Sequence, residues 1–192
     1  AAISACEKSE QWQRSLLTLA DMQFNTMRPN VISCDAAISS CGKGKNWECA
    51  LTVFVEMQEQ ALEAEVISFN AMASACERGL QWERALGILA RMRHNDMEPN
   101  AISYNAAISA SEKCEQWDQA LAILAERREQ GLEPDLISCS AAISACEKGG
   151  QWEWALAMLM DMEEQDLEPE VGSYASVISA CARGEQDMQV LI

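Results

Sequence analysis

A tryptophan recurs at constant spacing along the chain. Trp12, Trp47, Trp82, Trp117 and Trp152 follow one another at intervals of 35 residues. A fixed period of this length is typical of repeat architectures, in which one unit cannot bury its apolar face alone. The period therefore constrains the fold more than any other feature, because it requires neighbouring units to stack on one another.

The period divides the whole chain into equivalent units. With Val31 as the first residue of a repeat, there are four full repeats between two partial ones: 1–30, 31–65, 66–100, 101–135, 136–170 and 171–192. Because both ends of the sequence fall inside a unit, we expect it to be part of a longer array.

Each repeat has the pattern of two helices. A serine that can cap a helix by accepting a backbone hydrogen bond precedes the first, and a glycine, common at helix exits, ends it in four repeats. These residues are Ser33, Ser68, Ser103, Ser138 and Ser173, and Gly44, Gly79, Gly149 and Gly184. The second helix begins near the tryptophan, and Trp82, Ala85, Leu86 and Leu89 have the spacing of one helical face. A short turn containing proline, such as 131–135, closes the repeat.

Stacked helical hairpins form a solenoid. We therefore predict an all-α fold, a right-handed α-solenoid of 35-residue helix-turn-helix repeats whose first helices line one surface, although the period itself is compatible with either hand. The five repeated tryptophans are interpreted as packing residues. The alternative is that they stack on nucleic-acid bases, but a residue that opens the outer helix points the wrong way for that contact. Trp154 lies outside the repeated position and is expected to be exposed.

The nine cysteines are expected to be reduced. Their odd number leaves one thiol unpaired, and no C-x-x-C pair is present. One equivalent position of the repeat holds Cys6, Cys41, Cys76, Cys146 and Cys181. A small buried apolar thiol accounts for this use, and it favours a reducing compartment.

The sequence lacks the residues that a catalytic site or a metal site would require. His94 is the single histidine and is interpreted as a solvated surface residue. With no second histidine, a Cys–His or Ser–His catalytic pair would have to use His94, and no zinc cluster can form. No glycine-rich phosphate loop is present. No apolar run approaches the roughly 20 residues that span a membrane, and no leader peptide is visible. We expect no enzyme, no cofactor, no metal and no direct membrane insertion.

The period, the paired helices, the text ISYNAAISA at 102–110 and the text GLEPD at 131–135 resemble the pentatricopeptide repeat family. The resemblance covers essentially the whole chain. It implies single-stranded RNA binding at about one nucleotide per repeat. It also implies a plastid or mitochondrial protein that acts in RNA processing, stability, editing or translation.

The resemblance implies base-selecting positions, the fifth and last residues of each repeat. These pairs are Asp35 with Glu65, Asn70 with Asn100, Asn105 with Asp135, and Ser140 with Glu170. The third pair resembles the family's uridine pair and the second a pyrimidine pair that leans to cytidine, while Ser140 hints at a purine. The two glutamates depart from the usual aspartate or asparagine. An alternative explanation is that these residues only form turns and helix caps.

Two further sets follow from the resemblance. The second residue of each repeat packs between adjacent bases, which assigns Ile32, Ile67, Ile102 and Ile137, whereas Gly172 departs from the pattern. A basic residue near the end of each first helix, which we call the basic position, faces the RNA backbone. The basic positions are Lys8, Lys43, Arg78, Lys113, Lys148 and Arg183.

The net charge of −16 argues against ordinary nucleic-acid binding, which uses a basic surface. However, the first-helix segments contain six basic and five acidic residues, so they carry +1 and the rest of the chain carries −17. One cation per repeat suits one phosphate per nucleotide, whereas the simpler interpretation is a weak surface pair of neighbouring glutamate and lysine. The acidic exterior supports a second hypothesis, a protein-interaction scaffold in a large organellar assembly such as a ribosome or a membrane-bound bioenergetic complex.

Overall fold

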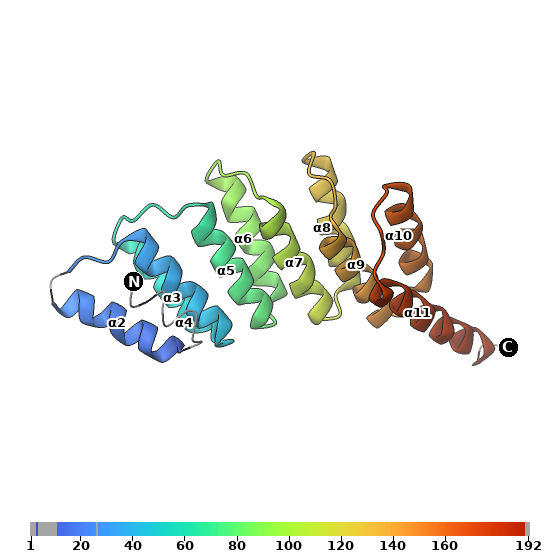
Figure 1. Cartoon of the computed structure of the whole chain (residues 1–192), viewed down its shortest axis with the longest axis horizontal. Coiled ribbons are helices and arrows are strands. Elements are labelled where there is room, and N and C mark those ends of the chain that lie inside the picture. Colours follow the sequence, from blue (N-terminus) through green and yellow to red (C-terminus); the bar gives the residue numbers. More distant parts are fainter. Residues whose placement is uncertain (1–2, 4–10, 26, 191–192) are drawn as a thin grey trace. The chain divides into compact units, whose positions relative to one another are not determined.

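The computed structural model describes residues 3, 11–25 and 27–190, with side chains described as far as Gly184. This part of the chain is helical, with short turns and no strand (Figure 1). The first helices of the repeats are α3 (Val31–Lys43), α5 (Val66–Arg78), α7 (Ala101–Lys113), α9 (Leu136–Lys148) and α11 (Val171–Val190). The second helices are α2 (Trp12–Phe24), α4 (Trp47–Glu59), α6 (Trp82–His94), α8 (Trp117–Glu129) and α10 (Trp152–Glu164). The prediction of an all-α repeat fold is confirmed.

The chain forms two compact units, Ala1–Ala106 and Ala107–Ile192, whose boundary falls inside α7. In the first unit, α3 packs against α2, α4 and α5, and α5 also packs against α6. In the second unit, α9 packs against α8, α10 and α11. Within each unit, a first helix therefore contacts its own partner and the first helix of the adjacent repeat.

The first helices begin earlier than the serine pattern predicts. In α3 the N-cap is Asn30, whose Oδ1 accepts a hydrogen bond of 2.9 Å from the Ser33 N–H, while the Ser33 hydroxyl accepts one of 2.9 Å from the Asn30 N–H. Asp135 and Ser138 form the same reciprocal pair in α9. The prediction that serine is the N-cap was wrong, because the last residue of the preceding repeat takes that place and serine completes a capping box.

The glycines that end the first helices are required by tryptophan packing. Gly79 has φ −84, which any residue can adopt, and the positive φ of 56 belongs to Leu80. A Cβ at Gly79 would lie 2.3 Å from Trp47 Cδ1. The same conflict recurs at three more places: Gly44 with Trp12, Gly149 with Trp117, and Gly184 with Trp152.

The tryptophans are therefore packing residues, as predicted, although they lie at the edge of the core. Trp47 is half-buried, Trp152 is 37% exposed and Trp154, outside the repeated position, is 52% exposed. The prediction that Gly184 ends its helix was wrong, since α11 continues to Val190. The period places Asp187 where the other repeats have tryptophan, so the sequence signal for a second helix is missing there.

The repeated cysteine position lies in the core. Burial raises the pKa of Cys41 to about 12 and the pKa of Cys76 and Cys146 to about 11. Cys181 is only half-buried, and Cys6 lies outside the described residues. The cysteines in the described part of the chain are free thiols, so small apolar packing accounts for the three buried ones at the repeated position.

Candidate nucleic-acid interface

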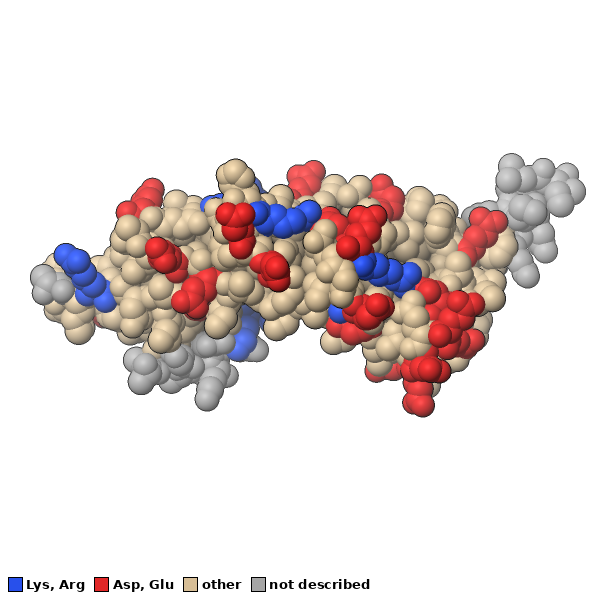
Figure 2. Space-filling view, turned by 90° about the horizontal axis from the view of Figure 1, so that it is seen from above, with Lys and Arg blue, Asp and Glu red and all other residues tan. Residues whose placement is uncertain are grey.

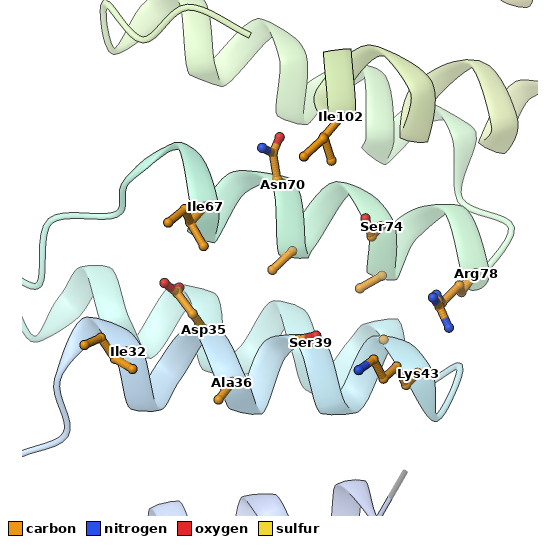
Figure 3. A pocket seen from close by; sticks show the side chains of 13 residues that line it. Ile32, Asp35, Ala36, Ser39, Lys43, Ile67, Asn70, Ser74, Arg78 and Ile102 are labelled. Atoms are coloured by element: carbon orange, nitrogen blue, oxygen red, sulfur yellow. The ribbon is translucent and has the colours of Figure 1, made fainter. Parts of the chain in front are cut away.

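A groove of about 510 Å³ lies along α3 and α5 in the first unit (Figure 3). Ile32 and Ile67 line it at the beginnings of these two helices, and Lys43 and Arg78 line it at their ends. The groove therefore brings apolar and cationic residues of two adjacent repeats into one surface.

Base-selecting candidates lie between those two ends. Asp35 and Asn70 both line the groove, and Ile102 lines it from the start of α7 (Figure 3). The floor is made of small residues such as Ala36 and Ser74. The three kinds of residue that the resemblance predicted thus meet in one open groove.

The four isoleucines at the second repeat position are exposed side chains, as a wedge between bases must be. Ile32, Ile67, Ile102 and Ile137 are 74%, 64%, 59% and 63% exposed. Each follows the first residue of its helix, a place that points away from the packed interior of the hairpin. Their exposure is compatible with the predicted contact to base faces and leaves that contact a prediction.

A serine joins the fifth residue of one repeat to the last residue of the same repeat. The Ser103 hydroxyl lies 2.5 Å from Asn70 Oδ1 and 3.2 Å from Asn100 Oδ1, and Asn70 Nδ2 donates to Asn100 Oδ1 at 3.2 Å. The structure therefore brings the predicted pair Asn70 and Asn100 into direct contact. The sequence pattern indicates only a capping role for Ser103 and gives no sign of this connecting role.

Asn100 also caps α7. Its Oδ1 accepts hydrogen bonds from the Ile102 N–H at 3.0 Å and the Ser103 N–H at 3.2 Å. The alternative interpretation as a helix cap thus holds for Asn100. It does not exclude base recognition, because the amide nitrogen of Asn100 takes no part in the cap.

Asp35 occupies the same repeat position as Asn70, but one of its two side-chain oxygens lacks a hydrogen bond among the described residues. Burial raises the pKa of Asp35, a hydrogen bond with Ser68 opposes that rise, and the charge of Glu65 adds to it. Ser68 therefore connects the predicted pair, because it bonds to the Asp35 carboxylate and accepts from the Glu65 N–H. The Oδ1 atom of Asp35 is buried and stays without a hydrogen bond among the described residues.

The selector candidates of the second unit are arranged differently. Ser140 Oγ lies 3.0 Å from Ser173 Oγ, the third helical residue after Glu170. Asp135 Oδ2 accepts from Arg127 Nη2 at 3.2 Å, and the side chain of Arg127 is only 3% exposed. Asn105 belongs to the first unit and Asp135 to the second, so their pairing stays a prediction.

Two of the basic positions are engaged in ion pairs between repeats. Lys148 Nζ lies 2.5 Å from Glu112 Oε1, and Arg183 Nη2 lies 2.9 Å from Glu147 Oε1. The partners are 36 residues apart, so the simpler interpretation of a pair between sequence neighbours was wrong for these residues. Lys8 lies outside the described residues.

Figure 2 shows one face on which acidic side chains are spread widely among fewer basic ones. His94 is exposed, as expected. In the described part of the chain, no helix is long and apolar enough to cross a membrane, and no group of three His, Cys, Asp or Glu residues could hold a metal ion.

The helical hairpins stack through a tryptophan–glycine contact and expose a groove along their first helices. These features define a helical repeat protein with an extended binding surface. The family model described as the pentacotripeptide-repeat region of PRORP matches residues 17–191. The chain belongs to this family, which confirms the resemblance seen in the sequence. A search of curated proteins finds no match.

Solved structures of this family share the fold. The pentatricopeptide repeat protein PPR10 from maize has a TM-score of 0.77 at 20% identity over 98% of the chain, and a structure of PPR10 in complex with an 18-nt psaJ RNA element has a TM-score of 0.76 at 20% identity over 97%. The chain spans 28% of the length of PPR10. The PPR domain of Arabidopsis thaliana protein-only RNase P 1, in complex with tRNA, has a TM-score of 0.80 at 12% identity, with 94% of this chain and 95% of that domain covered.

Proposed function

We propose that this chain binds single-stranded RNA along its first helices, at about one nucleotide per repeat, and contributes binding rather than catalysis. The observation that carries the proposal is the groove of the first unit, where exposed isoleucines, polar side chains and cations line one surface. Family membership and the RNA complexes of two similar structures support it.

The chemistry of the groove suits a nucleotide. Exposed aliphatic side chains such as Ile67 can contact base faces. The amide of Asn70 is largely buried and bonded to Asn100 and Ser103, but its second N–H and second lone pair can still serve a base edge in the groove. Arg78 at the far end can donate two hydrogen bonds to a phosphate. Recognition of one base by a few side chains of one repeat is a known mode of RNA reading.

Fluorescence anisotropy with labelled single-stranded RNA tests the proposal. We expect Ile67→Ala to weaken binding of a pyrimidine-centred oligonucleotide about tenfold, from the loss of roughly 1.5 kcal/mol of apolar contact. Val55→Ala removes another exposed aliphatic side chain, from the second helix α4, and should leave binding unchanged. An affinity for that oligonucleotide no better than for polyA would refute base selection, although not RNA binding itself.

We further infer an organellar role in RNA processing, stability, editing or translation. This inference rests on family membership. One similar structure is named as a nuclear RNase P, so the nucleus is a meaningful alternative outcome. Imaging of a fluorescent fusion of the full-length protein distinguishes a plastid or mitochondrion from the nucleus.

Protein binding is the second candidate function, and α10 favours it. Trp152, Leu156 and Met160 recur at intervals of four residues on this helix and are 37%, 39% and 56% exposed. Exposed apolar side chains in a row are typical of protein contacts. Reversing the basic positions Lys43, Arg78, Lys113 and Lys148 to glutamate should abolish RNA binding and spare a contact made by α10, whereas Leu156→Ser with Met160→Ser should do the opposite.

A further inference from the structure

The basic positions differ in their availability for a phosphate. We propose that Glu112 and Glu147 compete with the phosphates of a bound RNA for Lys148 and Arg183. In the described part of the chain, Arg78 has no such competitor and is therefore the stronger phosphate contact. This inference rests on the proposed RNA binding. It adds that the strength of the backbone contact is set repeat by repeat by a glutamate of the preceding repeat.

The competing carboxylates are held in place by several contacts. Glu112 Oε1 accepts from Lys148 Nζ and also from the Ser144 hydroxyl at 3.1 Å. Arg183 donates to Glu147 Oε1 and also to the Glu147 backbone carbonyl at 3.4 Å. The side chains of Glu112 and Glu147 are only 16% and 18% exposed. These pairs are therefore better ordered than an ordinary exposed ion pair.

The corresponding carboxylate is missing in front of Arg78. The residue 36 positions earlier is Gly42, where a Cβ would lie 3.0 Å from Ala75 Cβ and 3.1 Å from Ala75 Cα. Glycine supplies no carboxylate, and any side chain at position 42 would need Ala75 to shift by a few tenths of an ångström. Arg78 is exposed and forms no ion pair or side-chain hydrogen bond within the described part of the chain.

This difference has a direct consequence for phosphate binding. A phosphate approaching Lys148 must displace Glu112 or lie beside its negative charge, which screens the lysine and repels the ligand. At Arg78 the guanidinium keeps its donors available for bidentate contact with phosphate oxygens. Arg78 also lines the same groove as Ile67 and Asn70, so a nucleotide can use the three residues together.

The test measures the salt dependence of RNA affinity for the 192-residue chain. The probe is a fluorescein-labelled single-stranded RNA of alternating cytidine and uridine, titrated by anisotropy between low and moderate KCl. Each released phosphate contact lowers the slope of log K against log salt by about 0.7 for single strands. Arg78→Gln should weaken binding severalfold and reduce the slope by about that amount, and it should do so more than Lys148→Gln.

Releasing the competitor should have the opposite effect. Glu112→Gln should tighten binding severalfold and steepen the slope, and adding Lys148→Gln should reverse the gain. Glu153→Gln makes the same charge change at an exposed residue of α10 and serves as the control. Equal tightening by Glu153→Gln, or no tightening by Glu112→Gln in a protein that binds RNA, would overturn this inference alone. Absence of any RNA binding by the unmodified chain would overturn the proposed function and this inference with it.

Discussion

Replacing Gly79 by alanine is expected to destabilise the first unit. A Cβ at this position would lie 2.3 Å from Trp47 Cδ1, 2.7 Å from Cγ and 2.9 Å from Cβ. Such distances are far below van der Waals contact, and the indole is a rigid ring at the start of α4, so it cannot yield as the end of a flexible side chain can. Either Trp47 leaves its place or the two repeats move apart.

The size of the effect follows from two opposing contributions. Overpacking a close-packed site costs about 1–3 kcal/mol. Alanine in place of glycine recovers about 0.4–1 kcal/mol through the unfolded chain, because a φ of −84 suits alanine. The difference is a net cost of about 0–2.6 kcal/mol. Because the approach of 2.3 Å to a rigid ring is severe, we expect Gly79→Ala to lower the free energy of unfolding by about 1–2 kcal/mol.

Gly87 provides a matched control. It lies inside α6, and a Cβ there would meet nothing within 4 Å. Gly87→Ala should raise stability by about 0.5–1 kcal/mol, the usual preference of a helix interior for alanine. Urea unfolding followed by far-UV circular dichroism compares the two variants directly.

A double-mutant cycle isolates the contact with tryptophan. If the indole is the obstacle, Gly79→Ala should cost much less in a Trp47→Leu background than in the original chain, giving a coupling energy of about 1 kcal/mol. Gly79→Ala unfolding at the same urea concentration as Gly87→Ala would refute the reasoning. So would equal costs of Gly79→Ala in both backgrounds.

Two further predictions concern a cap and the buried thiols. Asp135→Ala removes the acceptor of the Ser138 N–H and the partner of the buried Arg127, so we expect a loss of about 2–3 kcal/mol, less than for a fully buried pair because Asp135 is partly exposed. Asp135→Asn keeps the cap and should lose less; equal losses in thermal unfolding would contradict the assignment. The raised pKa values of Cys41, Cys76 and Cys146 mean that the unfolded state loses these protons first as pH rises above about 9, so stability should fall toward pH 11 by up to about 1.4 kcal/mol per pH unit for each thiol. Urea unfolding between pH 8 and 10.5 measures this slope, which should flatten in Cys76→Ala; an unchanged slope would contradict the burial effect.

The period made the fold predictable, because a 35-residue spacing of tryptophans admits few architectures other than stacked hairpins. Helix starts were less predictable. Serine, asparagine and aspartate are all good N-caps, and Asn30 with Ser33 compete for the same role. The sequence shows both residues, but only the structure shows that Asn30 takes the cap and Ser33 the third helical position.

The positions of the candidate site residues on the first helices were predictable, but their contacts were not. Residues on the first helices could be assigned from the frame, and the groove does bring Asn70 and Arg78 to one surface. The pairing of Lys148 with Glu112 depends on how adjacent helices are offset, which a repeat period does not give. The glycine that breaks this series, Gly42, is visible in the sequence, but its meaning appears only when Ala75 is found against it.

Where a repeat ends in asparagine or aspartate, the proposed contact of that residue with a base is compatible with its role as a helix cap, for a chemical reason. Capping requires one side-chain oxygen, which asparagine and aspartate both supply at the same place. Their second atom differs: Asn100 keeps an amide N–H₂ donor, whereas Asp135 has a second oxygen that accepts from Arg127. A substitution between the two therefore preserves the helix start and exchanges a donor for an acceptor toward a base edge. The helix start thus places few limits on that second atom, but at Asp135 the buried Arg127 does, because it needs the second oxygen as an acceptor.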